Sequence, residues 1–301
     1  MATSFFPSRK RCCPQCSARQ VKDGKKTVTE YYHRAVVAHL IGFDLPIVLD
    51  LEMLRPGEGE ITAARRLLER LLKRYGRFFD AVQGDAIYFE APLFHLCRKH
   101  GKHLLAVLKE DNPALLADAK ALLQGPPDLV AEEKRNAKRI RFWDLEGFAT
   151  DAIPERAIRV LRAEETTAKR ERIAGQWAQT QQTSEWFWAT SVPQSLLPSR
   201  QLAQVGHERW KIENSIFNAL STHWAMDHCF HHHPAAILNF LLILFIAHIL
   251  LACFQRFNMK PPRRQRYALI ALAAQILLGI QSLAAKDCPR TAAPGHPPPR
   301  A

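Results

Sequence analysis

The stretch FDAVQGDAIY, residues 79–88, decides how we interpret this chain. It is largely apolar, and it ends in a carboxylate at Asp85, directly after Gly84. An apolar run of this length bounded by a glycine predicts a short buried strand. The strand would place Asp85 at its end, where a side chain can leave the sheet and meet a ligand. Asp85 is therefore the first candidate for a functional residue.

A second carboxylate, Glu213, lies in the stretch RWKIEN, residues 209–214. We predict a helix here, with Arg209 and Glu213 one turn apart on the same face. Two acids that converge from a strand end and a helix suit a hard divalent cation, which can align the oxygens of a phosphoryl transfer. The alternative for Arg209 and Glu213 is a surface ion pair that contributes little. For Trp210 we expect packing in the core.

Composition limits the classes of protein to which the chain can belong. At 301 residues and 47% hydrophobic, it can bury a substantial core as one or two domains. A formal net charge of +13 favours a polyanionic partner, nucleic acid before membrane, with simple solubility as the alternative. The N-terminal residues contain no apolar signal-peptide core, and seven cysteines do not indicate a disulfide framework. We expect a cytoplasmic protein.

Hydrophobic patterns predict an alternation of strands and helices over the first 110 residues. Strands are expected at 27–38, 45–51, 79–85 and 104–109, with helices at 61–75 and 92–100. This order predicts a mixed sheet covered by helices. Residues 111–195 follow as a β-rich insertion with a helix at 113–123 and strands at 139–143, 157–161 and 185–190. We expect the Gln- and Thr-rich segment before the last strand to be a loop.

The remaining residues are expected to be helical. One apolar helix covers residues 235–254, which is long enough to cross a bilayer, although it contains Asn239 and His248. A helix packed on all sides in a core has the same composition. A second apolar helix is expected at 268–284, followed by a Pro-rich tail that we expect to be disordered. A membrane-associated protein anchored by 235–254 therefore remains an alternative.

Cysteine and histidine residues form two further patterns. Cys13 and Cys16 have the spacing of half a zinc site, but zinc requires four ligands and no completing pair is evident nearby. His33 or the cluster HCFHHH, residues 228–233, could complete the site only if the fold brings them close. Our default interpretation is a loop with free thiols, and for the histidine cluster a polar helix end before Pro234.

Taken together, the motifs resemble those of the DDE transposases of bacterial insertion sequences. The resemblance covers about residues 3–255 and rests on the order and spacing of several motifs. They are SFFPS (4–8), CPQC (13–16), YYHR (31–34), GDAIY (84–88), RWKIEN (209–214), Trp224, Asp227 and His228.

This resemblance implies an α/β fold with an RNase H-like mixed sheet flanked by helices, a β-rich insertion and a helical C-terminal part. It implies Mg²⁺ or Mn²⁺ held by Asp85 and Glu213, which match the second and third acids of the family. DNA, as transposon ends and target, is the implied partner, with Lys211 as a candidate DNA contact and Arg209 either contacting a DNA phosphate or orienting Glu213. Arg263 and Arg264 are most simply part of a solvated basic tail, with contact to the DNA backbone as the alternative. A homo-oligomer or a full-length transposase is the further partner that the family suggests.

Three positions depart from the family pattern. The Tyr and Lys that flank the glutamate in many relatives are replaced here by Gly206 and Leu220. The first acid should belong to an Asp-Gly pair ahead of Phe5, where this chain has Met1 and Ala2. We therefore expect a truncated transposase whose first strand and first catalytic aspartate are missing, with impaired cleavage.

Two other acids could substitute for the missing one. Asp23 stands in a similar Asp-Gly pair, and Asp50 lies on a predicted strand, where an ordinary strand-end charge is the simpler interpretation. The non-enzymatic alternative is a DNA-binding relic that co-assembles with full-length transposase. The expected organisation is a partial catalytic core at 1–110, the insertion at 111–195, the glutamate-bearing helices at 196–258 and a basic, Pro-rich tail at 259–301.

Overall fold

A computed structural model describes residues 2–24, 26–42, 45–133, 138–173, 176–228, 231–261 and 268–287. The chain forms two compact units, Met1–Leu241 and Leu242–Ala301. The first unit contains both sheets and every candidate site residue that the structure describes.

The first sheet consists of β1 (Ala2–Ser8), β2 (Ser17–Asp23), β3 (Lys26–Leu40) and β4 (Ile47–Met53). All pairs are antiparallel, and the long strand β3 pairs with each of the other three. Helix α1 (Glu60–Tyr75) buries four leucines on one face, Leu67, Leu68, Leu71 and Leu72. Strands β3 and β4 and helix α1 confirm the sequence prediction, whereas β1 and β2 were not foreseen.

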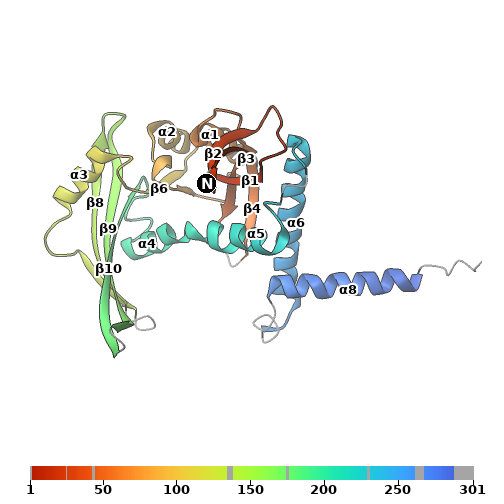
Figure 1. Cartoon of the computed structure of the whole chain (residues 1–301). Coiled ribbons are helices and arrows are strands. Elements are labelled where there is room, and N and C mark those ends of the chain that lie inside the picture. Colours follow the sequence, from red (N-terminus) through yellow and green to blue (C-terminus); the bar gives the residue numbers. More distant parts are fainter. Residues whose placement is uncertain are drawn as a thin grey trace, which may run out of the picture. The chain divides into compact units, whose positions relative to one another are not determined.

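The second sheet is mixed and has six strands in the order β5-β6-β10-β9-β8-β7. Figure 1 shows its long strands β8, β9 and β10 side by side. Its strands are β5 (Ala81–Gly84), β6 (His103–Val107), β7 (Leu129–Glu133), β8 (Lys138–Thr150), β9 (Ile153–Ile173) and β10 (Gln176–Thr190). Strands β5 and β6 are parallel, and the other pairs are antiparallel. Helices α2 (Ala91–Lys99) and α3 (Pro113–Leu122) flank it. The predicted α/β class with a helix-flanked mixed sheet is confirmed and is compatible with an RNase H-like fold.

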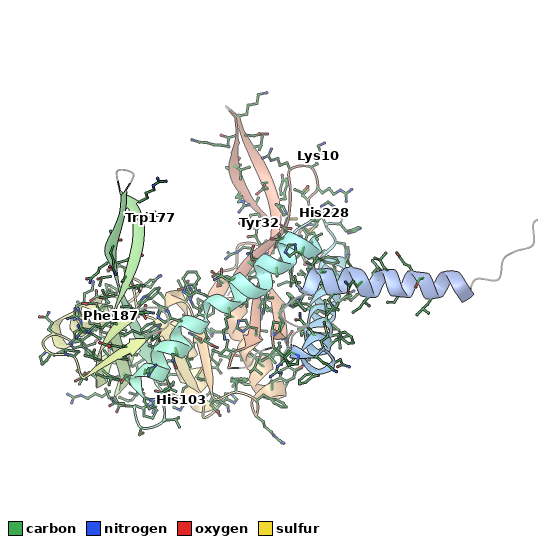
Figure 2. All side chains as sticks on the ribbon, turned by 90° about the horizontal axis from the view of Figure 1, so that it is seen from below. Lys10, Tyr32, His103, Trp177, Phe187 and His228 are labelled. Atoms are coloured by element: carbon green, nitrogen blue, oxygen red, sulfur yellow. The ribbon has the colours of Figure 1, made fainter. Side chains whose placement is uncertain are left out.

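One secondary-structure prediction was wrong. The Gln- and Thr-rich segment is not a loop, because β9 and β10 continue through it and pair from Gln176–Ile173 to Thr190–Arg159. In this hairpin the polar residues gain cross-strand partners, which a sequence window cannot reveal. Figure 2 shows Trp177 near the outer end of the hairpin and Phe187 near its base. The β-rich insertion thus continues the sheet that begins with β5.

Helices follow the second sheet. They are α4 (Ser199–Glu208), a π-helical segment η3 (Ile212–Phe217), α5 (Asn218–Trp224), α6 (Pro234–Asn258) and α8 (Leu269–Asp287). Among the described residues, α6 is the one helix long and apolar enough to cross a membrane, with mean hydropathy 2.7 in its most apolar part. Core helices of soluble proteins have the same composition, so length and hydropathy alone do not decide between the two.

A buried ion pair fixes the start of α4. The Arg159 side chain on β9 donates from Nε to Asp144 Oδ1 on β8 at 2.7 Å, and both side chains are almost fully buried. Arg159 Nη1 also donates to the Leu197 carbonyl at 2.7 Å, and Ser199 Oγ donates to Asp144 Oδ2 at 2.6 Å. Because Leu197 and Ser199 lead into α4, this network positions the helix that carries the chain to Arg209 and Glu213.

Candidate functional site

Asp85 lies at the end of β5, as the sequence predicts. Its carboxylate Oδ1 accepts a hydrogen bond from the Ala86 N–H at 2.9 Å and caps the short 3₁₀ helix η1 (Ala86–Tyr88). A Cβ atom at Gly84 would lie 2.5 Å from Tyr88 Cβ, so only glycine fits where this turn folds back on the strand. Glycine is thus required at position 84 for steric reasons, independently of any chemical role of Asp85.

Glu213 lies in η3, where the helix widens into a π-helical turn. Such turns insert an extra residue into a helix and occur frequently at functional sites. Arg209, which directly follows α4 and precedes η3 by three residues, is only 7% exposed. The predicted i, i+4 relation holds, because Arg209 Nη1 lies 3.4 Å from Glu213 Oε1.

The same guanidinium nitrogen also meets Asp85. Arg209 Nη1 lies 3.8 Å from Asp85 Oδ2, so the two carboxylates are separated by no more than the sum of these two distances. Asp85 and Glu213 keep 34% and 32% of their side-chain surface exposed. The fold therefore brings both acids, 128 positions apart in the sequence, to one partly open place.

Trp210 corrects a prediction. It does not pack in the core but remains 40% exposed, and the Arg209 guanidinium lies 4.1 Å from the centre of its ring. This stacking is a cation–π contact that holds the buried arginine from its outer side. The indole was expected to be buried because its size and hydrophobicity are typical of core residues.

A cavity of about 770 Å³ opens beside Asp85 and Arg209. It lies between β3 of the first sheet, β5 of the second sheet, α1 and α4. Its walls are mostly aliphatic, and its polar lining includes His39, Asp85, Glu208 and Arg209. Burial is the largest cause that lowers the pKa of His39 to about 4, so this imidazole is neutral at physiological pH.

A second set of polar residues beside Asp85 was missed by the sequence analysis. The Tyr88 hydroxyl donates to Glu60 Oε1 at 2.6 Å, and Arg34 Nη2 lies 3.1 Å from Glu60 Oε2. Burial, followed by the charges of Glu60 and Asp85, raises the pKa of Tyr88 well above its usual range. No pattern in the sequence connects Glu60 to Asp85. Glu60 is the first residue of α1, and it contacts Tyr88, which lies three residues after Asp85.

The donor set suits one hard cation. Carboxylate oxygens are the ligands that Mg²⁺ prefers, and this ion is normally held by one or two carboxylates with water completing the shell. Asp85 and Glu213 supply such oxygens, and both are open to solvent. In the present arrangement Arg209 neutralises part of their charge, so a bound cation would compete with the guanidinium for the same oxygens.

The predicted DNA contacts have different surroundings. Arg209 is buried against the two carboxylates, which favours the role of orienting Glu213 over contact with a phosphate. Lys211 is half exposed and forms an ion pair with Glu208 one turn earlier. Arg263 and Arg264 lie outside the described residues.

Neither acid considered as a substitute contacts Asp85 or Glu213 in any described interaction. Asp23, on the exposed β2–β3 hairpin, forms an ion pair with Arg9 at 2.7 Å. Asp50, on β4, accepts from Arg70 Nε at 2.6 Å, which agrees with its interpretation as a strand charge. Either acid would have to give up its arginine partner before it could join Asp85 and Glu213 around a cation.

The departures from the family pattern have packing reasons. A Cβ atom at Gly206 would lie 2.4 Å from the Trp188 indole nitrogen, so a tyrosine cannot replace Gly206 while α4 lies against β10. The amide of Gln83 on β5 donates to the carbonyls of Val205 and Gly206, each at 2.8 Å. Leu220 is fully buried, so a lysine there would lose its hydration.

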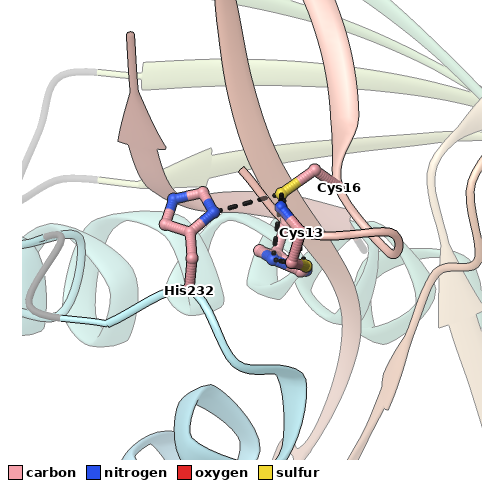
Figure 3. Close-up of side chains that lie close together, drawn as sticks. Cys13, Cys16 and His232 are labelled. Atoms are coloured by element: carbon pink, nitrogen blue, oxygen red, sulfur yellow. Dashed lines mark hydrogen bonds between the residues drawn. The ribbon is translucent and has the colours of Figure 1, made fainter. Parts of the chain in front are cut away.

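Cys13 and Cys16 do not lie in an isolated loop. Figure 3 shows both next to His232, and the Cys16 sulfur lies 3.1 Å from His232 Nδ1. His33 on β3 completes a group of four. The fold thus brings together the half site and the histidines that the sequence left unconnected, and it buries His232, for which the sequence predicted a polar helix end.

Comparison with protein families identifies a DDE transposase domain. Residues 14–250 match the model of the family "Transposase DDE domain". This match covers most of the chain and includes both carboxylates, so the chain belongs to the DDE transposase family. The comparison with curated proteins finds no match. Family membership makes this a transposase-like protein of DNA transposition; the family normally uses divalent metal ions and binds transposon ends.

Proposed function

We propose that Asp85 and Glu213 are the metal-binding carboxylates of a transposase that cuts and transfers DNA strands. The observation that carries this proposal is their convergence on Arg209 Nη1, at 3.8 and 3.4 Å. An ion pair with a purely structural role would need only one acid. The buried Arg209 guanidinium has two, Asp85 and Glu213, and a divalent ion can bind the same two carboxylates. The cytoplasm is the proposed location.

Each residue has a role that its surroundings support. When bound, a divalent ion would activate water and stabilise a leaving oxygen at phosphorus. Asp85 and Glu213 would hold it, and Arg209 would orient the Glu213 carboxylate from its buried side. Lys211, exposed on the same helical segment, would contact a DNA phosphate after leaving Glu208. Tyr88 and Glu60 would fix the turn on which Asp85 lies.

We further propose that cleavage is impaired. Among the described residues, two carboxylates converge here, which provide less charge and fewer fixed ligands than the three that the family resemblance implies, and octahedral Mg²⁺ tolerates poor geometry badly.

Strand cleavage of DNA carrying the element's terminal repeats tests both parts. We expect little or no nicking with Mg²⁺ or Mn²⁺, and robust nicking would refute impairment.

Mn²⁺ binding, followed by electron paramagnetic resonance, tests the metal site formed by Asp85 and Glu213. Asp85→Asn should weaken it about tenfold or more, a loss that even outer-shell changes cause in metal sites. Asp80→Asn is the matched control, since this exposed carboxylate precedes β5 and pairs only loosely with Lys102 at 3.8 Å. Equal binding by both variants would refute the assignment of Asp85.

A non-catalytic relic is the second candidate function. It is favoured by the ion pairs that Arg209 makes with both carboxylates, because they give the cluster a stable form without a metal. Such a protein would shift terminal-repeat DNA in a gel and would reduce cleavage by an added full-length transposase through co-assembly. Cleavage by the chain alone would exclude this alternative.

Association with a membrane through residues 235–254 is the remaining alternative. On α6, the side chains of Ile243, Ile246, Leu250 and Phe257 are more than half exposed. Fractionation of cells that express the full chain separates the two locations. Recovery in the soluble fraction supports the cytoplasmic proposal, and recovery with membranes after a salt wash contradicts it.

A further inference from the structure

Four metal-ligating side chains meet on the face of the first sheet, away from Asp85 and Glu213. Cys13 and Cys16 lie in the loop between β1 and β2, where the Cys16 N–H closes a tight turn onto the Cys13 carbonyl at 3.1 Å. His33 comes from the middle of β3 and His232 from the segment that precedes α6. One ligand atom from each residue lies within 4.8 Å of all the others.

The distances are those of a tetrahedron around a small ion. With zinc–sulfur and zinc–nitrogen bonds of about 2.3 and 2.0–2.1 Å, tetrahedral angles put two sulfurs about 3.8 Å apart and a sulfur and a nitrogen about 3.5 Å apart. The two sulfurs here are separated by 3.6 Å. His33 Nε2 lies 3.5 Å from the Cys13 sulfur and 3.4 Å from the Cys16 sulfur. The Cys16–His232 distance of 3.1 Å is slightly shorter.

The imidazole of His232 is oriented for ligation. Its Nε2 lies 2.9 Å from the Phe6 carbonyl, which can only accept, so this nitrogen carries the proton. The lone pair therefore resides on Nδ1, the atom that points toward Cys16 (Figure 3). Metal-bound histidines almost always donate their other ring N–H to a carbonyl or carboxylate in this way.

The backbone of β1 supplies this carbonyl. The β1–β3 register shifts between Phe5 and Ser8, and Phe6 has a positive φ of 52°. The irregularity releases the Phe6 carbonyl from the regular ladder, and it accepts from His232 instead. The Cys13 N–H also points at the Cys16 sulfur at 3.2 Å, a contact that stabilises a thiolate.

We propose that Cys13, Cys16, His33 and His232 bind one structural Zn²⁺. Two sulfurs and two imidazole nitrogens in a tetrahedron are the donor set that zinc selects, and hard ions such as Mg²⁺ avoid it. Four protein ligands leave no open position for water or substrate, so this ion does not catalyse a reaction. His33 and His232 are buried, at 2% and 6% exposure, which closes the site further.

The zinc ion would connect segments that the chain separates widely. His232 is 199 positions from His33, and it follows α5 and η3, of which η3 carries Glu213. Binding to zinc ties the end of these segments to β3 and to the β1–β2 loop. The ion would thus hold the glutamate-bearing helices against the first sheet, and its loss would loosen Glu213 without removing a ligand of the catalytic ion.

The first test measures zinc in the full chain, purified without a histidine tag. We expect one zinc per chain by plasma mass spectrometry. In Co²⁺-substituted protein we expect the intense visible bands of tetrahedral cobalt together with thiolate-to-cobalt charge transfer. Wild-type protein with far less than one zinc, whose Co²⁺ spectrum is weak and octahedral, would refute the proposal.

Variants locate the ion, and the chain offers close controls. Cys16→Ser and His232→Ala should each lose most of the zinc and the charge-transfer intensity. The neighbouring changes Cys12→Ser and His231→Ala should retain both, because Cys12 and His231 lie outside the group of four. Equal zinc content in Cys16→Ser and Cys12→Ser would contradict the assignment.

If a variant that lacks a zinc ligand fails to fold, the wild-type chain can still be used to test the zinc site. Removal of the ion by a zinc-selective chelator should lower the melting temperature, and stoichiometric Zn²⁺ should restore it, since metal binding contributes directly to folding free energy. An unchanged melting temperature after verified removal of the zinc would refute the structural role. Mg²⁺ should not restore it, which separates this ion from the one proposed at Asp85 and Glu213.

Discussion

At the scale of single residues, the buried pair of Arg159 and Asp144 has the largest expected effect on stability. Its charges are desolvated and satisfied by each other, by Ser199 and by the Leu197 carbonyl. Removal of one partner leaves the other charge buried and unpaired, which costs about 3–5 kcal/mol. By contrast, exposed pairs such as Arg9–Asp23 contribute about 0–1 kcal/mol.

We therefore predict that Asp144→Ala lowers the free energy of unfolding by about 3–5 kcal/mol. Asp23→Ala, the matched change in an exposed pair, should lower it by no more than about 1 kcal/mol. Chemical denaturation followed by circular dichroism measures both values. Similar losses in the two variants would contradict the view that the buried network anchors α4.

At the scale of elements, the packing of α4 against the second sheet depends on the missing side chain of Gly206. A Cβ atom there meets the indole of Trp188, which is itself fixed in the core. Gly279 in α8 is the natural contrast, because a Cβ atom there meets nothing within 4 Å.

Gly206→Ala should destabilise the protein by about 1–3 kcal/mol, as overpacking does, and should weaken Mn²⁺ binding because α4 leads to Glu213. Gly279→Ala should be neutral or stabilise by about 0.5–1 kcal/mol, since alanine is the better helix former. Thermal unfolding and Mn²⁺ titration of both variants check this. A Gly206→Ala protein with native stability and affinity would show that α4 does not need its close approach to Trp188.

At the scale of the whole molecule, the positive charge should govern the DNA binding that the family implies. A net charge of +13 makes release of phosphate counterions a large part of binding, so affinity should fall steeply with salt. Lys211→Ala should reduce the slope of log K against log salt by about one unit, the effect of one lost phosphate contact.

Lys73→Ala serves as the control, because Lys73 is an exposed lysine in the last turn of α1. Its slope should match that of the wild-type chain. Fluorescence anisotropy with terminal-repeat DNA at several salt concentrations gives all three slopes. An unchanged slope for Lys211→Ala would remove this residue from the DNA interface.

The class of protein and most of the elements follow from the amino-acid pattern alone. The apolar run before Asp85 and the spacing of leucines in α1 depend on local periodicity, which a window of residues contains. The motif order that resembles DDE transposases agrees with the family match over residues 14–250. The Gln- and Thr-rich hairpin escaped prediction because its strands are stabilised by pairing with each other, not by an apolar face of their own.

Contacts between residues far apart in the chain become visible only in the folded protein. Arg209 between Asp85 and Glu213, Glu60 behind Tyr88, and His33 and His232 around Cys13 and Cys16 are all contacts between separate segments. A single sequence records which donors exist, but not the chain path that sets the distances between them. Metal binding depends on distances of a few ångströms between ligand atoms. Periodicity and composition describe only residues that are neighbours along the chain.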